Sequence, residues 1–375
     1  MDIDKEFPLD KDICYLNHAA VSPWPQRTHD RVVAFAHENL TRGAQHYPQW
    51  LEVESNLRQQ CRDLLNAESV DDIGLVKNTS EALSMVAHGI DWQAGDNVVI
   101  PEHEFPSNRV VWESLVKDGV EIRQVDTRST SEPEKALMEQ FDSKTRLLSV
   151  SSVQYDIGLR LNLVDLGAFC HQKEVLFCVD AIQSLGVLPL DVQTIKADFV
   201  MADGHKWLLG PEGLAIFYSR PSARNQLKLN EFGWHMLENL YDFDNQEWSI
   251  AKSARRFECG SPNMLGIYAL DASLSIFSEI GMQSISRNII NNTSYIIDKL
   301  DNIAGIKVQT PYQQEHHAGI VNFKLLQTDP VPVHESLMQH GVICALRGGG
   351  LRFSPHFYTP RTVIDKALSI LEDIL

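Results

Sequence analysis

The sequence lacks the glycine-rich phosphate loops on which nucleotide-dependent enzymes rely. Neither Gly-x-Gly-x-x-Gly nor Gly-x-x-x-x-Gly-Lys-Ser/Thr occurs after a predicted strand, and the run Gly348-Gly349-Gly350 has a different spacing. The six cysteines form no Cys-x-x-Cys pair and show no ligand-like spacing to histidine. We therefore expect no nicotinamide or ATP site of these types, and free, mostly packed thiols in a reducing cytoplasm.

Excess positive charge and long apolar runs are also absent. The 375 residues carry a net charge of −17, whereas nucleic acids and anionic membranes demand a dense basic surface. No apolar run is long enough to cross a bilayer, and the acidic opening segment does not resemble a secretory signal. These absences predict a cytoplasmic protein with a small-molecule substrate, no nucleic-acid partner and no membrane attachment.

The composition that is present is that of a globular protein, with 43% hydrophobic and 22% charged residues. Between Glu68 and Ala269, short β-branched runs alternate with helical patterns, which predicts a mostly parallel, doubly wound α/β sheet with helices on both faces. After Leu270 the pattern changes to a long amphipathic helix and short strands. We expect a large α/β domain at residues 16–270 and a smaller α+β domain formed by residues 1–15 and 271–375.

Two polar residues follow predicted buried strands in the middle of the chain. Asp180 ends an apolar run at 175–179, and Lys206 lies between a run at 199–201 and a glycine-containing turn. Because parallel strands present their carboxyl ends at one edge of a sheet, we expect both side chains to face one ligand. A lysine that forms a Schiff base and a carboxylate that holds a pyridinium nitrogen are the equipment of pyridoxal phosphate (PLP) chemistry.

A predicted helix starts at Asn78-Thr79-Ser80-Glu81, where hydroxyl groups and free backbone amides meet. Such a helix start binds anions, and Thr79, Ser80 and His205 can supply donors to a phosphate. The alternative is a capping box formed by Asn78 and Glu81, which needs no ligand. The residues alone leave both interpretations open.

Phe105 follows the predicted strand that ends at Ile100, and it can stack on a flat heteroaromatic ring. Ordinary packing of an aromatic side chain in a loop is the alternative. His103 in the same loop is flanked by Glu102 and Glu104, but no second histidine stands at a zinc-binding spacing. We therefore predict no metal site.

Polar residues near both ends of the chain are candidates for substrate binding. Arg352 stands beside a glycine turn among apolar residues and can clamp a carboxylate with two guanidinium nitrogens. A salt bridge to one of the many acids is the alternative for Arg352, and Arg347 has the same ambiguity. Asn17 and His18 lie among small residues, where the backbone either approaches a ligand closely or forms an ordinary loop.

Taken in order, these segments resemble the class V aminotransferase and cysteine desulfurase superfamily of fold type I PLP enzymes over nearly the whole chain. The Phe-Pro-Ser-Asn context of Phe105 looks more like the isopenicillin N epimerase-like branch. The matching motifs are Asn17-His18-Ala19-Ala20, Asn78-Thr79-Ser80-Glu81, Val179-Asp180-Ala181-Ile182-Gln183-Ser184, Gly204-His205-Lys206 with Gly210-Pro211-Glu212-Gly213, Arg256-Phe257-Glu258-Cys259-Gly260-Ser261-Pro262-Asn263, and Arg352 with Tyr358-Thr359.

The resemblance implies a role for each matching residue. Lys206 would be the catalytic Schiff-base lysine, and Asp180 the catalytic partner of the pyridine nitrogen. Ser261 stands where the family commonly completes the phosphate site from a partner subunit, so a homodimer is implied. The cofactor-binding set would be Thr79, Ser80, Phe105, Asp180, Gln183, His205, Lys206 and Ser261, and the substrate-binding set Asn17, His18 and Arg352.

Two departures from the desulfurase pattern bear on the reaction. The loop that carries a nucleophilic cysteine in desulfurases is shortened here to Gly348-Gly349-Gly350, and the nearest thiol, Cys344, lies on a predicted apolar strand. Asp203 replaces the hydroxyl that desulfurases usually place beside the phosphate. We therefore predict first an aminotransferase acting on an amino acid or amine. A PLP-dependent C–S/β-elimination lyase or epimerase comes second, a cysteine desulfurase third, and a PLP-binding sensor or structural homologue is the non-enzymatic alternative.

Overall fold

The computed structural model describes residues 1–242, 244 and 246–375. Its centre is a seven-stranded sheet with the order β2-β8-β7-β6-β5-β3-β4. Strands β3 to β7 pair in parallel, whereas β8 runs antiparallel to both of its neighbours. The expected mostly parallel α/β sheet is confirmed. The strands are Ile73–Val76 (β2), Asn97–Pro101 (β3), Glu121–Val125 (β4), Thr145–Ser151 (β5), Leu176–Asp180 (β6), Phe199–Asp203 (β7) and Ala215–Ser219 (β8).

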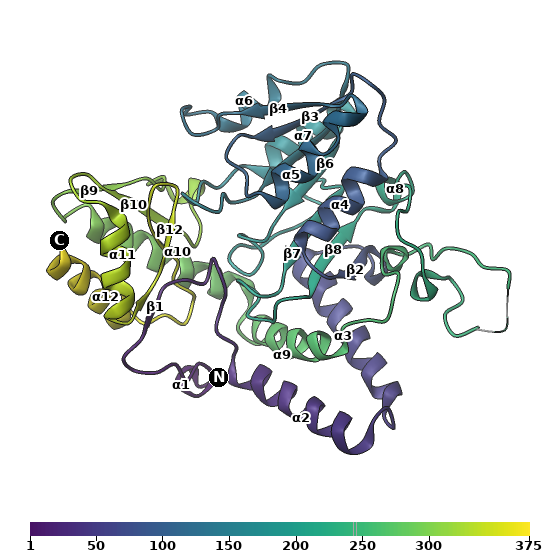
Figure 1. Ribbon diagram of the computed structural model, residues 1–375, viewed down its shortest axis with the longest axis horizontal. Coiled ribbons are helices and arrows are strands. Elements are labelled where there is room, and N and C mark those ends of the chain that lie inside the picture. Colours follow the sequence, from purple (N-terminus) through teal and green to yellow (C-terminus); the bar gives the residue numbers. More distant parts are fainter. Residues whose placement is uncertain (243, 245) are drawn as a thin grey trace.

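Helices cover this sheet, which explains why its central strands are apolar without alternation. Every residue of β2, β3, β7 and β8 is buried. Helix α9 packs against α2 and α3 below the sheet in Figure 1. The helices of the large domain are Gln26–Arg42 (α2), Tyr47–Leu65 (α3), Thr79–Gly89 (α4), Ser107–Glu113 (α5), Pro133–Met138 (α6), Leu163–Lys173 (α7), Pro221–Arg224 (α8) and Met264–Ile280 (α9).

A smaller α+β lobe lies at the left of Figure 1. Its antiparallel sheet has the order β12-β13-β10-β9, and a short parallel pair, β1 with β11, ties the amino-terminal segment to this end of the chain. Its elements are Cys14–Tyr15 (β1), Met282–Leu300 (α10), Ile306–Val308 (β9), Val321–Leu325 (β10), Pro330–Gln339 (α11), Val342–Ile343 (β11), Ala345–Arg347 (β12), Gly350–Phe353 (β13) and Arg361–Ile374 (α12). The short helix Ile3–Glu6 (α1) contacts α2 of the large domain.

The predicted domain boundary at residue 270 falls inside α9, which continues unbroken to Ile280. The chain bends instead by 89° between α9 and α10. Within the described residues, no single helix has the length and hydropathy of a membrane span, although α9 and α10 taken together across their bend meet that measure.

The carboxyl ends of the parallel strands create one polar edge. Ser151 ends β5 directly opposite Asp180, which ends β6, and Asp203 ends the neighbouring β7. The β12–β13 hairpin of the small lobe reaches the same region, because Arg352 donates a hydrogen bond to the carbonyl of Tyr155 in the loop after β5. This edge is the crevice in which open α/β sheets bind ligands.

Candidate active site

Lys206 lies in the turn after β7, with 9% of its surface exposed. Its Nζ is 5.6 Å from the centre of the Phe105 ring. Burial lowers the pKa of Lys206 to about 8; the positive charge of Arg352 also lowers it, and Asp180 opposes the shift. An amine held near this pKa has a substantial neutral fraction at physiological pH, and the neutral form is the nucleophile and base.

Asp180 is buried at the end of β6, where its Oδ1 accepts a hydrogen bond of 3.0 Å from the backbone N–H of Ile182. Burial raises the pKa of Asp180 to about 6, while the Ile182 hydrogen bond and the charge of Lys206 lower it. The carboxylate is therefore ionised at neutral pH. Asp180 and Lys206, predicted to share a ligand, interact electrostatically across one site.

The start of α4 combines a cap with unused donors. The side chain of Asn78 accepts a 2.8 Å hydrogen bond from Glu81 N–H, so the capping interpretation holds in part. Yet Thr79 Oγ1 and His205 Nδ1 are buried without a hydrogen-bond partner among the described residues. Ser80 is exposed, and its hydroxyl donates to Ser107 Oγ at 2.7 Å. The cap thus leaves buried polar groups for a ligand.

Arg352 is a buried cation without a counter-ion. Only 2% of its surface is exposed, and no carboxylate among the described residues lies within ion-pair distance, so the salt-bridge alternative is wrong. Its Nη1 donates to Tyr155 O at 2.5 Å, its Nη2 lies 3.5 Å from Asn17 Oδ1, and its Nε is unpartnered. Burial lowers the pKa of Arg352 to about 10. A buried guanidinium with a free N–H is suited to a ligand carboxylate.

His18 lies behind this region rather than on its surface. The residue is fully buried, and its two ring nitrogens contact Ser354 O and Tyr358 Oη, each at 2.8 Å. Burial lowers the pKa of His18 to about 4, so the ring is neutral. This geometry leaves no ring nitrogen for a substrate, and His18 instead fixes the loop that carries Asn17.

Gln183 is buried and engaged at both ends of its amide. Its Nε2 donates to Ala19 O at 3.0 Å, and its Oε1 accepts from Trp207 Nε1 at 2.8 Å. One Nε2 hydrogen remains for a ligand. Gln183 therefore connects the loop after β6 with the segment that carries Lys206.

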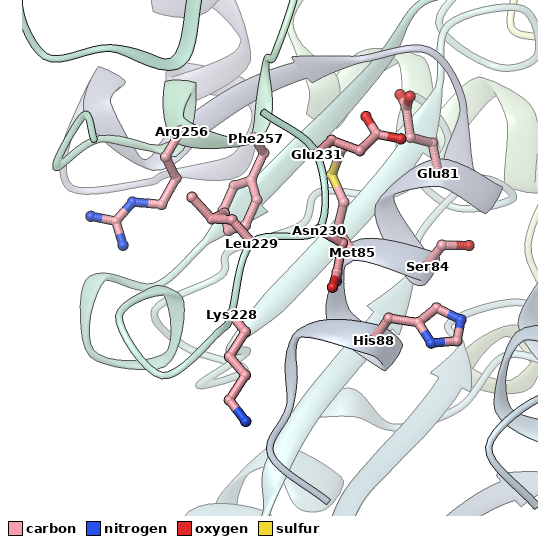
Figure 2. Close-up of a pocket in the computed structure, with 10 residues that line it drawn as sticks. All are labelled: Glu81, Ser84, Met85, His88, Lys228, Leu229, Asn230, Glu231, Arg256 and Phe257. Atoms are coloured by element: carbon pink, nitrogen blue, oxygen red, sulfur yellow. The ribbon is translucent and has the colours of Figure 1, made fainter. Parts of the chain in front are cut away.

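Ser261 is exposed, and Lys206 does not line the cavity beside it. Ser261 lines this cavity of about 430 Å³, which also includes Glu81, Glu231 and Phe257. Those three residues also line an adjoining cavity of about 500 Å³ beside α4, shown in Figure 2 with Lys228 and Arg256 at its rim. None of the residues predicted to bind the cofactor or the substrate lines this second cavity.

Two functional neighbours had no clear signal in the sequence. Glu104 is buried and accepts a 2.6 Å hydrogen bond from Ser151 N–H, opposite Asp180 in the sheet. Burial raises the pKa of Glu104 to about 8. Tyr155 packs edge-on against the Phe105 ring at 5.1 Å. In the sequence, the position of Glu104 immediately before Phe105 was the one signal that it lies near the site. No sequence pattern pointed to Tyr155.

Metal binding has little support in the described residues. A buried cluster of Glu54, His235 and Glu258 has metal-like spacing, but Arg58 already pairs with both carboxylates at 2.6 and 2.7 Å. A second cluster consists of Glu102, His103 and Asp126 and is largely exposed.

Comparison with known proteins places this geometry in a family. The model of the family described as aminotransferase class-V matches residues 14–356. A cysteine desulfurase from Yersinia pestis (strain Pestoides F) is 31% identical, over 92% of this chain and 86% of that protein. A probable cysteine desulfurase from Methanothermobacter thermautotrophicus is 29% identical, over 100% of this chain and 97% of that protein.

Solved structures show the same fold. The enzyme C-DES, in a form with glycine covalently linked to PLP, superposes with a TM-score of 0.92 at 20% identity and covers 99% of both chains. An apo cysteine desulfurase from Thermococcus onnurineus NA1 gives a TM-score of 0.87 at 23% identity, over 99% of this chain and 97% of that one. The named relatives do not test the expected isopenicillin N epimerase-like branch, which stays a prediction. The family depends on PLP, and by its match over residues 14–356 this chain belongs to the class V aminotransferase family.

Proposed function

We propose that this protein is a PLP-dependent lyase that breaks the Cβ–S bond of a sulfur-containing α-amino acid by elimination, without an enzyme thiol. The observation that carries the proposal is the position of the cysteines. Five of the six are buried, and the sixth, Cys259, lines the cavity of Ser261, to which Lys206 does not contribute. The named relatives are desulfurases, but the site of this chain has no thiol to accept sulfur.

The residues at the edge of the sheet fit PLP. Unpartnered donors of Thr79 and His205 at the start of α4 suit the phosphate, and the ionised Asp180 suits a protonated pyridine nitrogen. The Phe105 ring lies beside the Lys206 amine, so its face is available to stack on the cofactor ring. When bound, PLP supplies an aldehyde that captures the substrate amine and a ring that withdraws electrons from the bonds at Cα.

Lys206 is placed to move the proton. Its amine, with a pKa lowered to about 8 by burial, takes the Cα proton in its neutral form. Arg352 holds the substrate carboxylate, which fixes the direction of the Cα–H bond relative to the amine. Loss of the thiol or persulfide from Cβ then completes the elimination.

The hairpin that precedes Arg352 supports elimination over desulfuration. Gly348 and Gly349 have φ angles of 56° and 71°, a tight turn that favours glycine. Asn322 and Gln309 fix this turn by donating to Arg347 O at 2.8 Å and Gly348 O at 3.1 Å. Cys344 is buried, and burial raises its pKa to about 12, so its thiol stays protonated and is a poor nucleophile. One solved neighbour is a complex of the cystine C-S lyase C-DES with its product, cysteine persulfide.

An aminotransferase, predicted first from the sequence, ranks behind the lyase because the named relatives are desulfurases. A product assay separates the reactions. With cystine, elimination consumes water and releases pyruvate, ammonia and cysteine persulfide. We expect pyruvate and ammonia in equal amounts, with no added keto acid. Alanine as the main product would instead indicate a desulfurase, keto-acid-dependent turnover an aminotransferase, and loss of optical purity alone an epimerase. A spectral change without any product would indicate a sensor.

A homodimer is the second part of the proposal. In the single chain Ser261 is exposed beside the cavity that includes Glu81 from the first turn of α4. A second copy seated there would bring one protomer's Ser261 toward the phosphate site of the other. Light scattering of the PLP-loaded protein tests this proposal, and a fully loaded monomer would contradict it.

A further inference from the structure

The phosphate cradle contains an acid where the sequence pattern of desulfurases has a hydroxyl. Asp203 ends β7, and its Oδ2 accepts a 3.1 Å hydrogen bond from Thr79 N–H, a free amide at the start of α4. Its Oδ1 lies 3.9 Å from His205 Nδ1. A carboxylate therefore already occupies part of the helix terminus that a phosphate would use.

Three buried polar atoms without partners among the described residues meet at this point. They are Thr79 Oγ1, Asp203 Oδ1 and His205 Nδ1. Buried polar groups are nearly always hydrogen-bonded. The Thr79 side chain lowers the pKa of Asp203 as a hydrogen-bond donor, so His205 Nδ1, 3.9 Å from Asp203 Oδ1, is the atom that most clearly needs a ligand. A phosphate ester has the acceptor oxygens that Thr79 and His205 require. It has no hydrogen-bond donor for the carboxylate of Asp203 unless a proton lies between the two groups.

The charges around Asp203 do not compensate a phosphate dianion. Burial raises the pKa of Asp203; Thr79 and Lys206 lower it, and Glu212 in the turn before β8 adds to the rise. Burial lowers the pKa of His205 to about 4, with a further contribution from Lys206. Without ligand, His205 is thus neutral, and Lys206 is a cation that acts on both Asp203 and His205.

We propose that this cradle binds the phosphate of the cofactor together with one additional proton, which is carried by Asp203 or by the neighbouring His205. The proposal rests on the PLP site proposed above. A dianion beside a buried carboxylate is repelled, and protonating the Asp203–His205 pair removes that repulsion and gives Asp203 a donor for the phosphate. Binding coupled to uptake of one proton weakens about tenfold for each pH unit above the second pKa of the phosphate, which is about 6.

The experiment compares pyridoxamine phosphate with pyridoxamine, which lacks the phosphate. Neither molecule has the aldehyde needed to react with Lys206, and their rings and amines titrate alike. The ratio of the two dissociation constants therefore isolates the phosphate. Both constants are measured on the full chain by fluorescence quenching. For the wild type, we expect the preference for the phosphate form to fall about tenfold per unit between about pH 7 and about pH 9.

Variants of Asp203 test whether this residue is responsible for the proton that is taken up on binding. Asp203→Asn should flatten the pH dependence and tighten pyridoxamine phosphate binding at the alkaline end. Asp203→Ser, which restores a hydroxyl, should do the same and serves if the first variant folds poorly. Glu212→Gln removes a nearby exposed acid that does not touch the cradle, and it should keep the wild-type slope.

Calorimetry in buffers of different ionisation enthalpy gives a second readout. We expect uptake of about one proton with pyridoxamine phosphate and none with pyridoxamine. A flat ratio in the wild type, or an unchanged slope in both Asp203 variants, would overturn this inference and leave the proposed lyase untouched. Failure of pyridoxamine phosphate to bind at any pH would contradict both the inference and the PLP site.

Discussion

The amine of Lys206 lies 5.6 Å from the centre of the Phe105 ring, although 101 positions separate the two residues in the sequence. The loop after β3 and the turn after β7 therefore lie close together. Asp180 ends β6, which lies between β7 and β3 in the sheet. A flat ring attached to Lys206 would have an aromatic face beside it and a carboxylate within electrostatic reach.

Replacement of Phe105 by Leu should weaken PLP binding about 2- to 12-fold, because ring stacking contributes about 0.5–1.5 kcal/mol beyond burial. Phe105→Tyr keeps the ring and serves as the control. Titration of apo protein by absorbance measures both constants. Equal affinity for the Leu and Tyr variants would show that Phe105 only packs against Tyr155.

Replacement of Arg352 by Lys should raise KM for amino acids by about 10- to 100-fold, since the planar fork and its free Nε–H are lost while the charge remains. The unfavourable desolvation of an unpaired buried cation should persist in this variant. Amines without a carboxylate should react equally well with both proteins. Steady-state kinetics with a matched acid and amine checks this, and a parallel loss for the two substrates would argue for a structural role.

Glu104 should make the protein less stable as the pH rises. Burial raises its pKa from an ordinary 4.5 to about 8, so the folded chain binds more protons than the unfolded chain between these values. The free energy of unfolding therefore falls as the pH rises through this window and levels off above it. Glu104→Gln should show a smaller fall. Urea denaturation across the window tests the difference, and parallel curves for the two proteins would contradict it.

Cys344→Ala should leave the rate of sulfur release unchanged, because the proposed elimination uses no protein thiol. Ser336→Ala, in the neighbouring α11, is a control for small surface changes. Assay of sulfide and pyruvate with cysteine and cystine suffices. Abolished sulfur release with retained PLP binding would make Cys344 a sulfur acceptor and return the desulfurase to first place.

Much of the fold and part of the site were predictable from local pattern. Apolar strands without alternation indicated a sheet covered on both faces, and Asp180 and Lys206 stood at strand ends that a parallel sheet must bring together. The antiparallel course of β8 was not predictable, because a buried strand reads the same in either direction.

Contacts between loops that are far apart in the sequence could not be predicted either. Arg352 donates a hydrogen bond to the carbonyl of Tyr155, and His18 is hydrogen-bonded to Ser354 and Tyr358. These contacts depend on the register in which the small lobe packs against the large domain. No composition or spacing encodes that register. The same limit applies to Asp203, whose bond to Thr79 appears only when β7 and α4 are set side by side.

Borohydride reduction of the PLP-loaded protein, followed by peptide mass mapping, shows which lysine forms the Schiff base. We expect a single phosphopyridoxyl group on the peptide that contains Lys206, and none in a Lys206→Ala variant. Label on another lysine, or no label in protein that remains folded, would contradict this expectation.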